Sequence, residues 1–94
     1  QALTKTDNED LKDLINARLA RVQLGQKKPD AALATVAAVK GKGWAAYAQD
    51  IRGDALLQKG DVKGAQEAYT AGIQSEGAGT IKSVMTFKLD NLAG

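Results

Sequence analysis

Apolar residues recur with helical spacing along residues 44–76, the stretch around which the rest of the chain is organised. Two helical faces can be traced, one over residues 44–58 and one over residues 62–73. They carry Trp44, Ala48, Ile51 and Ala55, and then Val62, Ala65, Ala68, Tyr69, Gly72 and Ile73. Between them, Gly60 suits the left-handed position after a helix, and Asp61 can cap the next helix. With small residues such as Gly53 where the backbones meet, the stretch predicts a helical hairpin.

The same spacing predicts another hairpin before this stretch and a single helix after it. Residues 7–26 form the first helix, which begins at a capping box made by Thr6 and Glu9. Residues 31–40 form the second, after a turn at Pro29, and Thr80 can cap the last helix. The apolar positions of the three helices are Leu11, Leu14, Ile15, Leu19 and Val22; Ala32, Leu33, Val36 and Val39; and Ile81, Val84, Met85, Leu89 and Leu92.

The chain repeats with a period of 33 residues. This offset relates Ala32 to Ala65, and applied twice it relates Ile15, Ala48 and Ile81. The period is close to the ~34 residues of a tetratricopeptide repeat. We therefore expect one all-α domain over residues 1–94, a tetratricopeptide-like solenoid of about five helices. It would consist of two helical hairpins plus a C-terminal capping helix, with residues 1–6 frayed.

The composition removes most catalytic chemistry. The chain has no cysteine and no histidine, so no thiol nucleophile, disulfide, imidazole base or Cys/His metal site can form. Asp50 and Asp54 are carboxylates at i and i+4, but no base accompanies them, and the segment 41–43 lacks the spacing of a phosphate loop. We expect no enzyme activity, no catalytic residue, no cofactor and no metal.

Charge and hydropathy narrow the class of partner. The net charge of +2 is too small to indicate nucleic-acid binding. The lysines at positions 27, 28, 40 and 42 lie at predicted helix ends, where the helix dipole favours cations; a phosphate or lipid contact is the alternative. No apolar run approaches the ~20 residues of a membrane span. Other polypeptides remain the expected partners.

A candidate binding surface follows from the solenoid. Stacked helical hairpins curve, and the first helix of each hairpin lines the concave surface. Eight positions are expected to point into it: Leu14, Ala17, Arg21, Leu24, Tyr47, Asp50, Asp54 and Leu57. Such a mixed apolar and polar groove suits an extended or helical polypeptide. The three leucines are also explained as core residues, and the three charged residues as a solvated or ion-paired face.

Trp44 is the single tryptophan and permits two interpretations. Tryptophan is enriched among the residues that anchor partners. It also packs well as a core aromatic between hairpins, which is the interpretation we favour. Tyr69 occupies the large-residue position of its repeat and is expected in the core.

Several motifs are more specific than the repeat itself. RLARVQL at residues 18–24, KGKGWAA at 40–46, RGDALLQKGD at 52–61 and KLDNL at 88–92 resemble the YfgM family, the ancillary subunits of the bacterial SecYEG translocon. The resemblance covers residues 7–92. It implies the C-terminal part of a periplasmic tetratricopeptide-like domain whose full-length protein has a cytoplasmic tail and one inner-membrane helix. It also implies transfer of emerging polypeptides from SecYEG to periplasmic chaperones, alongside the membrane-anchored PpiD.

Two roles remain open for this stretch. In the first it contacts polypeptide clients or chaperones through the groove. In the second it only completes the solenoid, or serves as a generic scaffold, and upstream helices carry the binding surface. The chain looks like a C-terminal fragment, so apolar residues of its first helix, such as Leu11, Leu14 and Val22, would be left uncovered. Exposed apolar stripes self-associate, and we expect a homodimer through this helix.

Overall fold

Helices account for most of the chain in the computed structural model, which describes residues 5–75 and 78–93, with side chains placed for 8–75 and 78–92. The elements are α1 (Lys5–Gly25), α2 (Pro29–Val36), the short 3-10 turn η1 (Lys42–Trp44), α3 (Ala45–Gln58), α4 (Val62–Ile73) and α5 (Gly79–Ala93). Within the described residues, the expectation of five α-helices is confirmed. The expected fraying of residues 1–6 falls largely outside the described part.

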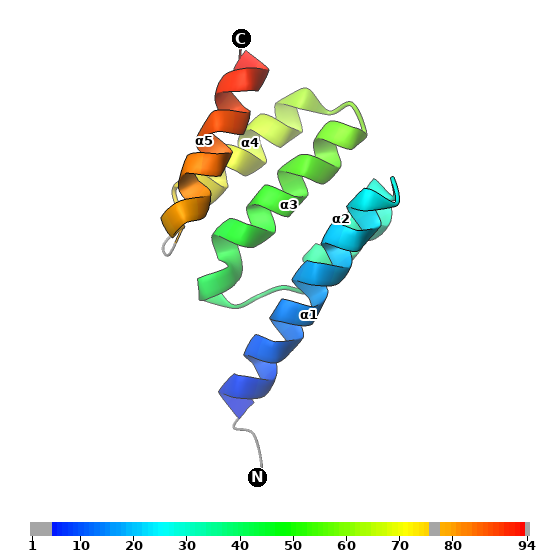
Figure 1. Ribbon diagram of the computed structural model, residues 1–94, viewed down its shortest axis with the longest axis vertical. Helices are drawn as coiled ribbons and strands as arrows, with labels where there is room; N and C mark the ends of the chain where they lie inside the picture. Colours follow the sequence, from blue (N-terminus) through cyan, green and yellow to red (C-terminus); the bar gives the residue numbers. More distant parts are fainter. Residues whose placement is uncertain (1–4, 76–77, 94) are drawn as a thin grey trace.

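The helices form two layers. α1, α3 and α5 lie side by side on the face nearest the viewer in Figure 1, and α2 and α4 lie behind them. α1 with α2, and α3 with α4, make two successive antiparallel hairpins, and α5 packs against the second. This arrangement is the predicted solenoid of two hairpins and a final helix.

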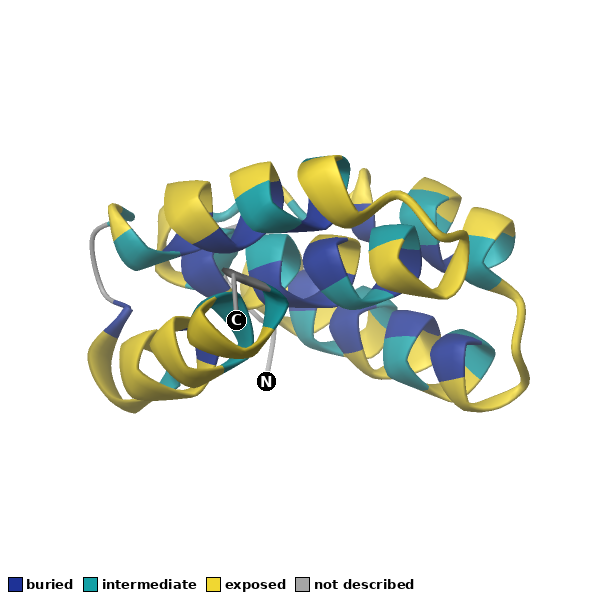
Figure 2. Cartoon of the chain, turned by 90° about the horizontal axis from the view of Figure 1, so that it is seen from above, coloured by how far each residue is buried: buried dark blue, intermediate teal, exposed yellow. Residues whose placement is uncertain are grey.

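The core is built from small and aliphatic side chains and divides into two clusters. The first joins α1, α2 and α3 around Ile51, which is fully buried. The second joins α3, α4 and α5 around Tyr69 and Met85, which are also fully buried. Figure 2 shows the buried residues on the helix faces that turn toward one another. The predicted core position of Tyr69 is confirmed.

Two glycines allow the second cluster to pack closely. A Cβ at Gly53 would lie 2.4 Å from Cε1 of the Tyr69 ring, and a Cβ at Gly72 would lie 2.4 Å from the sulfur of Met85. Real Cβ atoms do not approach other atoms so closely. Gly53 therefore lets the Tyr69 ring rest against the backbone of α3, and Gly72 lets Met85 of α5 rest against α4.

The turn chemistry of the second hairpin is confirmed. Gly60 has a φ of 84°, the left-handed conformation that glycine adopts without a steric penalty. The Asp61 side chain accepts a hydrogen bond from the backbone N–H of Gly64 at 2.8 Å and so caps α4. Pro29 occupies the first turn of α2, where its missing N–H costs nothing.

Three predicted helix boundaries are wrong. Residues 37–40 were expected to continue α2, but it ends at Val36 because the chain turns to meet Asp13 of α1. This buried carboxylate accepts from the backbone N–H groups of Lys40 at 3.3 Å and Gly41 at 2.9 Å. α1 and α5 each begin before the residue expected to cap them, so Thr6 and Thr80 lie within helices. The side chain of Thr6 lies outside the described residues.

Candidate functional site

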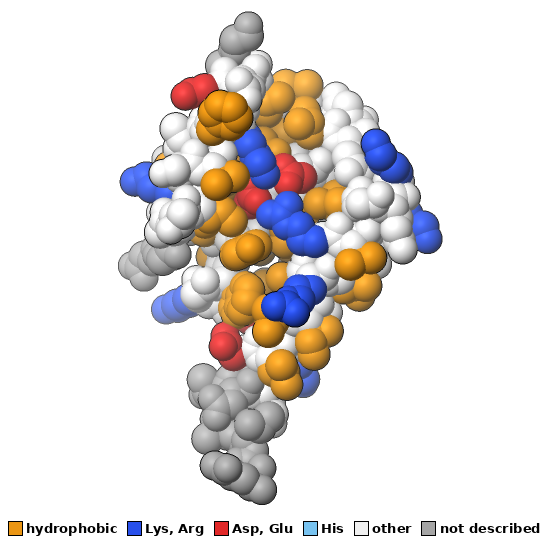
Figure 3. Space-filling model, viewed as in Figure 1, with side chains coloured by type: hydrophobic (Ala, Val, Ile, Leu, Met, Phe, Trp, Pro, Cys, Tyr) orange, Lys and Arg blue, Asp and Glu red, His pale blue; other side chains and the backbone are white. Residues whose placement is uncertain are grey.

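The eight predicted groove residues lie on α1 and α3, in the layer that faces the viewer in Figure 3. Seven of them line two neighbouring surface hollows, which share Arg21. The first, the Trp44 hollow, has a volume of about 170 Å³ and is lined by Leu14, Ala17, Arg18, Arg21, Trp44 and Tyr47. The second, the Leu57 hollow, has a volume of about 440 Å³ and is lined by Arg21, Leu24, Asp54, Leu57 and Gln58.

The eight groove residues differ in how far their side chains are exposed to solvent. Ala17 and Leu24 are buried and belong to the first core cluster, so for Leu24 the core interpretation holds even though it borders a hollow. Leu14 is half-buried, whereas Tyr47 and Leu57 are 44% and 39% exposed. Asp50 lines neither hollow and is only 1% exposed. The accessible apolar part of the groove is therefore carried mainly by Tyr47 and Leu57 of α3.

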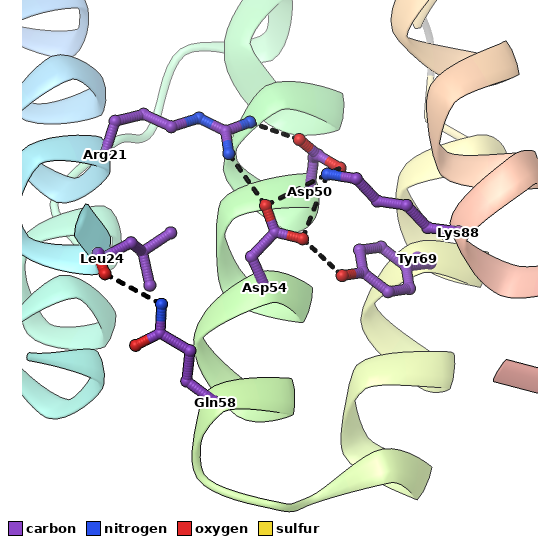
Figure 4. A network of polar contacts seen from close by, with 7 residues as sticks. All are labelled: Arg21, Leu24, Asp50, Asp54, Gln58, Tyr69 and Lys88. Carbon is purple, nitrogen blue, oxygen red and sulfur yellow. Dashed lines mark hydrogen bonds and ion pairs between the residues drawn. The ribbon is translucent and has the colours of Figure 1, made fainter. Parts of the chain in front are cut away.

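Arg21 connects the two hollows and is fixed from below by α3. Its guanidinium donates from Nη1 to Oδ2 of Asp54 at 2.8 Å and from Nη2 to Oδ2 of Asp50. Figure 4 shows the two carboxylates one helical turn apart, both turned toward the guanidinium. Gln58 adds a hydrogen bond from Nε2 to the backbone oxygen of Leu24 at 2.9 Å. The predicted charged trio is thus brought together as an ion-paired cluster.

Two members of this cluster were missed by the sequence analysis. Lys88 of α5 donates from Nζ to Asp50 at 2.9 Å and to both oxygens of Asp54 at 3.1 Å. The hydroxyl of Tyr69 on α4 donates to Oδ1 of Asp54 at 2.5 Å. The 33-residue period offered a signal, because Arg21 and Lys88 lie 33 positions before and 34 positions after Asp54.

The cluster is electrically balanced, with two carboxylates facing two cations. Burial opposes the charge on Arg21, but its hydrogen bonds and charge interactions with Asp50 and Asp54 outweigh burial and raise its pKa. Burial, together with the hydrogen bond to the Asp54 carboxylate, raises the pKa of Tyr69 far above its usual value. Arg21 therefore stays charged and Tyr69 stays neutral, and the cluster ties four helices together.

Trp44 both packs and faces the groove. It rests against the first core cluster, as the favoured interpretation expected. Its indole Nε1 donates to Asp10 of α1 at 2.8 Å, and its ring centroid lies 5.9 Å from that of Tyr47. The guanidinium of Arg21 lies 5.8 Å from the centroid of the Tyr47 ring, within the range of a cation–π contact.

Two further kinds of site, a metal centre and a membrane span, bear on what the described residues can do. No group of acidic side chains in 8–75 and 78–92 has the arrangement to hold a metal ion. Of the helices traced in the described part, none is long and apolar enough to cross a membrane. What the geometry offers is a hollowed surface above an electrically balanced ion-paired cluster, of the kind used to contact other proteins.

Two helical hairpins stacked in register, with adjoining hollows along α1 and α3, define a protein-interaction repeat domain. The chain belongs to the tetratricopeptide repeat-like domain family, whose model it matches over residues 1–94. It is 48% identical over 93 residues to the ancillary SecYEG translocon subunit of Escherichia coli strain K12. It is 34% identical over 92 residues to the ancillary SecYEG translocon subunit of Haemophilus influenzae. No solved structure matches the chain.

These comparisons confirm the resemblance identified from the sequence motifs. The matches cover 99% and 98% of this chain but only 45% of each relative, so the chain spans less than half the length of these proteins. The relatives and the family are non-enzymatic, which agrees with the expectation that the chain is not an enzyme.

Proposed function

We propose that this chain is the polypeptide-contacting part of a translocon-associated protein. The Trp44 hollow and the Leu57 hollow together form the α1–α3 furrow, and we propose that this furrow holds extended segments of other proteins. The single observation that carries the proposal is the pair of adjoining hollows on either side of Arg21. Leu14 and Leu24, at the two ends of the furrow, are separated by ten residues of α1, or ~15 Å. That length matches about five residues of extended polypeptide.

The chemistry of the furrow suits loose recognition of many sequences. Its walls combine exposed Tyr47 and Leu57 with the polar groups of Arg21, Asp54 and Gln58. The negative charges of Asp50 and Asp54 already balance the positive charges of Arg21 and Lys88, so this ion-paired cluster presents little net charge to a partner. Affinity would then come from several modest apolar contacts and hydrogen bonds to the peptide backbone.

The relatives suggest a setting for this activity. Two ancillary SecYEG translocon subunits resemble nearly the whole chain. By that similarity, the full-length protein acts on the periplasmic side of the bacterial inner membrane beside SecYEG. There it helps pass newly translocated polypeptides to periplasmic chaperones such as a PpiD-like partner. The competing role is a structural cap that only completes the solenoid.

Crosslinking from single photoreactive residues in the full-length, membrane-bound protein separates these roles. Positions 47 and 57 are the best probe sites, because Tyr47 and Leu57 are exposed and lie in different hollows. Thr70, exposed on α4 away from both hollows, is the matched control. Adducts with translocating chains or chaperones from positions 47 and 57, and not from 70, support the proposal. Silence at both groove positions, with adducts only from upstream helices, leaves the structural cap.

A second surface supports self-association. Four apolar residues follow one face of α1 and are 45–56% exposed: Leu11, Ile15, Leu19 and Val22. A stripe of this kind on a helix is rarely left in water, because covering it releases ordered solvent. We propose that two copies of the chain associate through this α1 stripe.

A further inference from the structure

The Trp44 hollow has the size of a socket for one side chain. Its volume is about 170 Å³, close to the ~150 Å³ of an engineered apolar cavity that accommodates a benzene ring. Leu14, Ala17, Trp44 and Tyr47 supply most of its lining. A phenylalanine, tyrosine or leucine side chain matches this volume, whereas an alanine would leave most of it empty.

The walls of the socket are held in place without a ligand. Asp10 fixes the indole of Trp44 through the 2.8 Å hydrogen bond from Nε1. Arg21 lies against the Tyr47 ring and is itself held by Asp50 and Asp54. A side chain entering the hollow therefore meets surfaces that are already ordered, which lowers the entropic cost of binding.

The rim of the socket carries an unmatched positive charge. Two arginines and no carboxylate line it. Arg21 is committed to Asp50 and Asp54, but Arg18 is exposed and makes no ion pair with any side chain placed in the structure. A carboxylate next to the inserted side chain would find in Arg18 the bidentate partner that guanidinium groups favour.

We infer that the Trp44 hollow recognises one aromatic or leucine-sized side chain of an extended polypeptide and that Arg18 favours an aspartate or glutamate beside it. This rests on the proposed polypeptide-binding function and adds a preference within it. The anchor enters the socket, the acidic neighbour pairs with Arg18, and the chain continues past Arg21 toward the Leu57 hollow.

Tryptophan fluorescence gives a direct test, because Trp44 is the only tryptophan in the chain and lines the socket. The probes are eleven-residue peptides of glycine and serine with a central Phe-Glu, Ala-Glu, Phe-Gln or Phe-Lys pair. We expect Phe-Glu to shift the emission and bind at least about tenfold more tightly than Ala-Glu, as expected from burying one aromatic side chain. It should bind about two- to fivefold more tightly than Phe-Gln, the range for an exposed ion pair.

Protein variants make the test specific. Arg18→Glu should reverse the preference from Phe-Glu to Phe-Lys, and Tyr47→Ala should weaken every phenylalanine peptide. Arg52→Glu and Phe87→Ala are matched controls, since both residues are exposed and line neither hollow. Circular dichroism of each variant establishes that it is folded.

The outcomes distinguish this inference from the function on which it rests. Equal binding of all four peptides, or an unchanged preference in folded Arg18→Glu, overturns the inference. If position 57 still crosslinks to translocating chains in that case, polypeptide binding stands without this preference. If no peptide binds and positions 47 and 57 are both silent, both proposals fail.

Discussion

Arg21 and Asp50 lie 29 positions apart in sequence, on different repeats, yet form an ion pair whose carboxylate is 1% exposed. Arg21 itself keeps 38% of its side chain exposed and borders both hollows. Buried Asp50 therefore stabilises the contact between the two repeats, while Arg21 presents a fixed cation to the groove. Changes at its two ends should have different effects.

Removing the buried charge should cost stability. Asp50→Asn leaves Arg21 and Lys88 with only Asp54 for charge compensation. Breaking a buried ion pair costs about 3–5 kcal/mol. Because both cations are partly exposed, we expect a loss of about 2 kcal/mol in the free energy of unfolding, measured by urea denaturation.

The exposed pair between Lys59 and Asp30 is the control for this measurement. Asp30 is 82% exposed, and exposed ion pairs contribute at most about 1 kcal/mol. If Asp30→Asn and Asp50→Asn cost the same, the buried cluster does not have the structural role assigned to it.

Gly53→Ala should destabilise the second hairpin although alanine is the better helix former. Alanine gains about 1 kcal/mol in helix propensity, but its Cβ would overlap the Tyr69 ring at 2.4–2.7 Å. That ring is buried and held by Asp54, so it cannot move aside. We expect the free energy of unfolding to fall by about 2 kcal/mol or more, in the range for overpacked cores. Thermal or urea denaturation measures this change.

Gly72→Ala provides the comparison. Its Cβ would meet the sulfur of Met85, but methionine is flexible and can rotate away. The loss should be smaller than for Gly53→Ala, and a larger loss would contradict the view that the rigid ring sets the cost.

Stability should fall at alkaline pH because of Tyr69. Its pKa in the folded chain is raised above the usual tyrosine value of about 10, chiefly by burial and then by Asp54. Above pH ~10 the unfolded chain loses this proton while the folded chain keeps it, so unfolding is favoured as pH rises. The stabilisation present below that pH is lost progressively above it.

A Tyr47→Phe background leaves Tyr69 as the sole tyrosine, because the chain has two. Ultraviolet absorbance of tyrosinate should then appear only together with the loss of helical circular dichroism. Ionisation of Tyr69 in the folded chain near pH 10 would show that the hydroxyl is not held as described. Tyr69→Phe should flatten the alkaline part of the stability profile.

The α1 stripe should drive concentration-dependent association. Leu19→Lys places a charge in the middle of the exposed apolar face and should shift the chain toward monomer in light scattering. Phe87→Lys is the control, since Phe87 is 68% exposed and lies on α5. A parent chain that stays monomeric at high concentration would exclude the dimer.

The fold was predictable because several independent patterns agreed on it. Helical spacing, the turn at Gly60 and the 33-residue period all indicated stacked hairpins, and they also placed Arg21, Asp50 and Asp54 on one face. The early end of α2 was not predictable, because it depends on backbone N–H groups reaching Asp13, a contact between segments 27 and 28 positions apart. Lys88 was missed because helical spacing alone does not show that α5 packs against Asp50 and Asp54; its place 34 positions after Asp54, close to the repeat period, was the available signal.

Repeat solenoids generally unfold in pieces, because each repeat touches only its neighbours. Here Asp50 and Asp54, one turn apart on α3, bind both Arg21 of α1 and Lys88 of α5. Asp54 also accepts a hydrogen bond from the Tyr69 hydroxyl of α4. Loosening α5 therefore withdraws a cation from carboxylates that also hold α1. A change that speeds amide hydrogen exchange in α5 should therefore also speed it in α1, as in one cooperative unit.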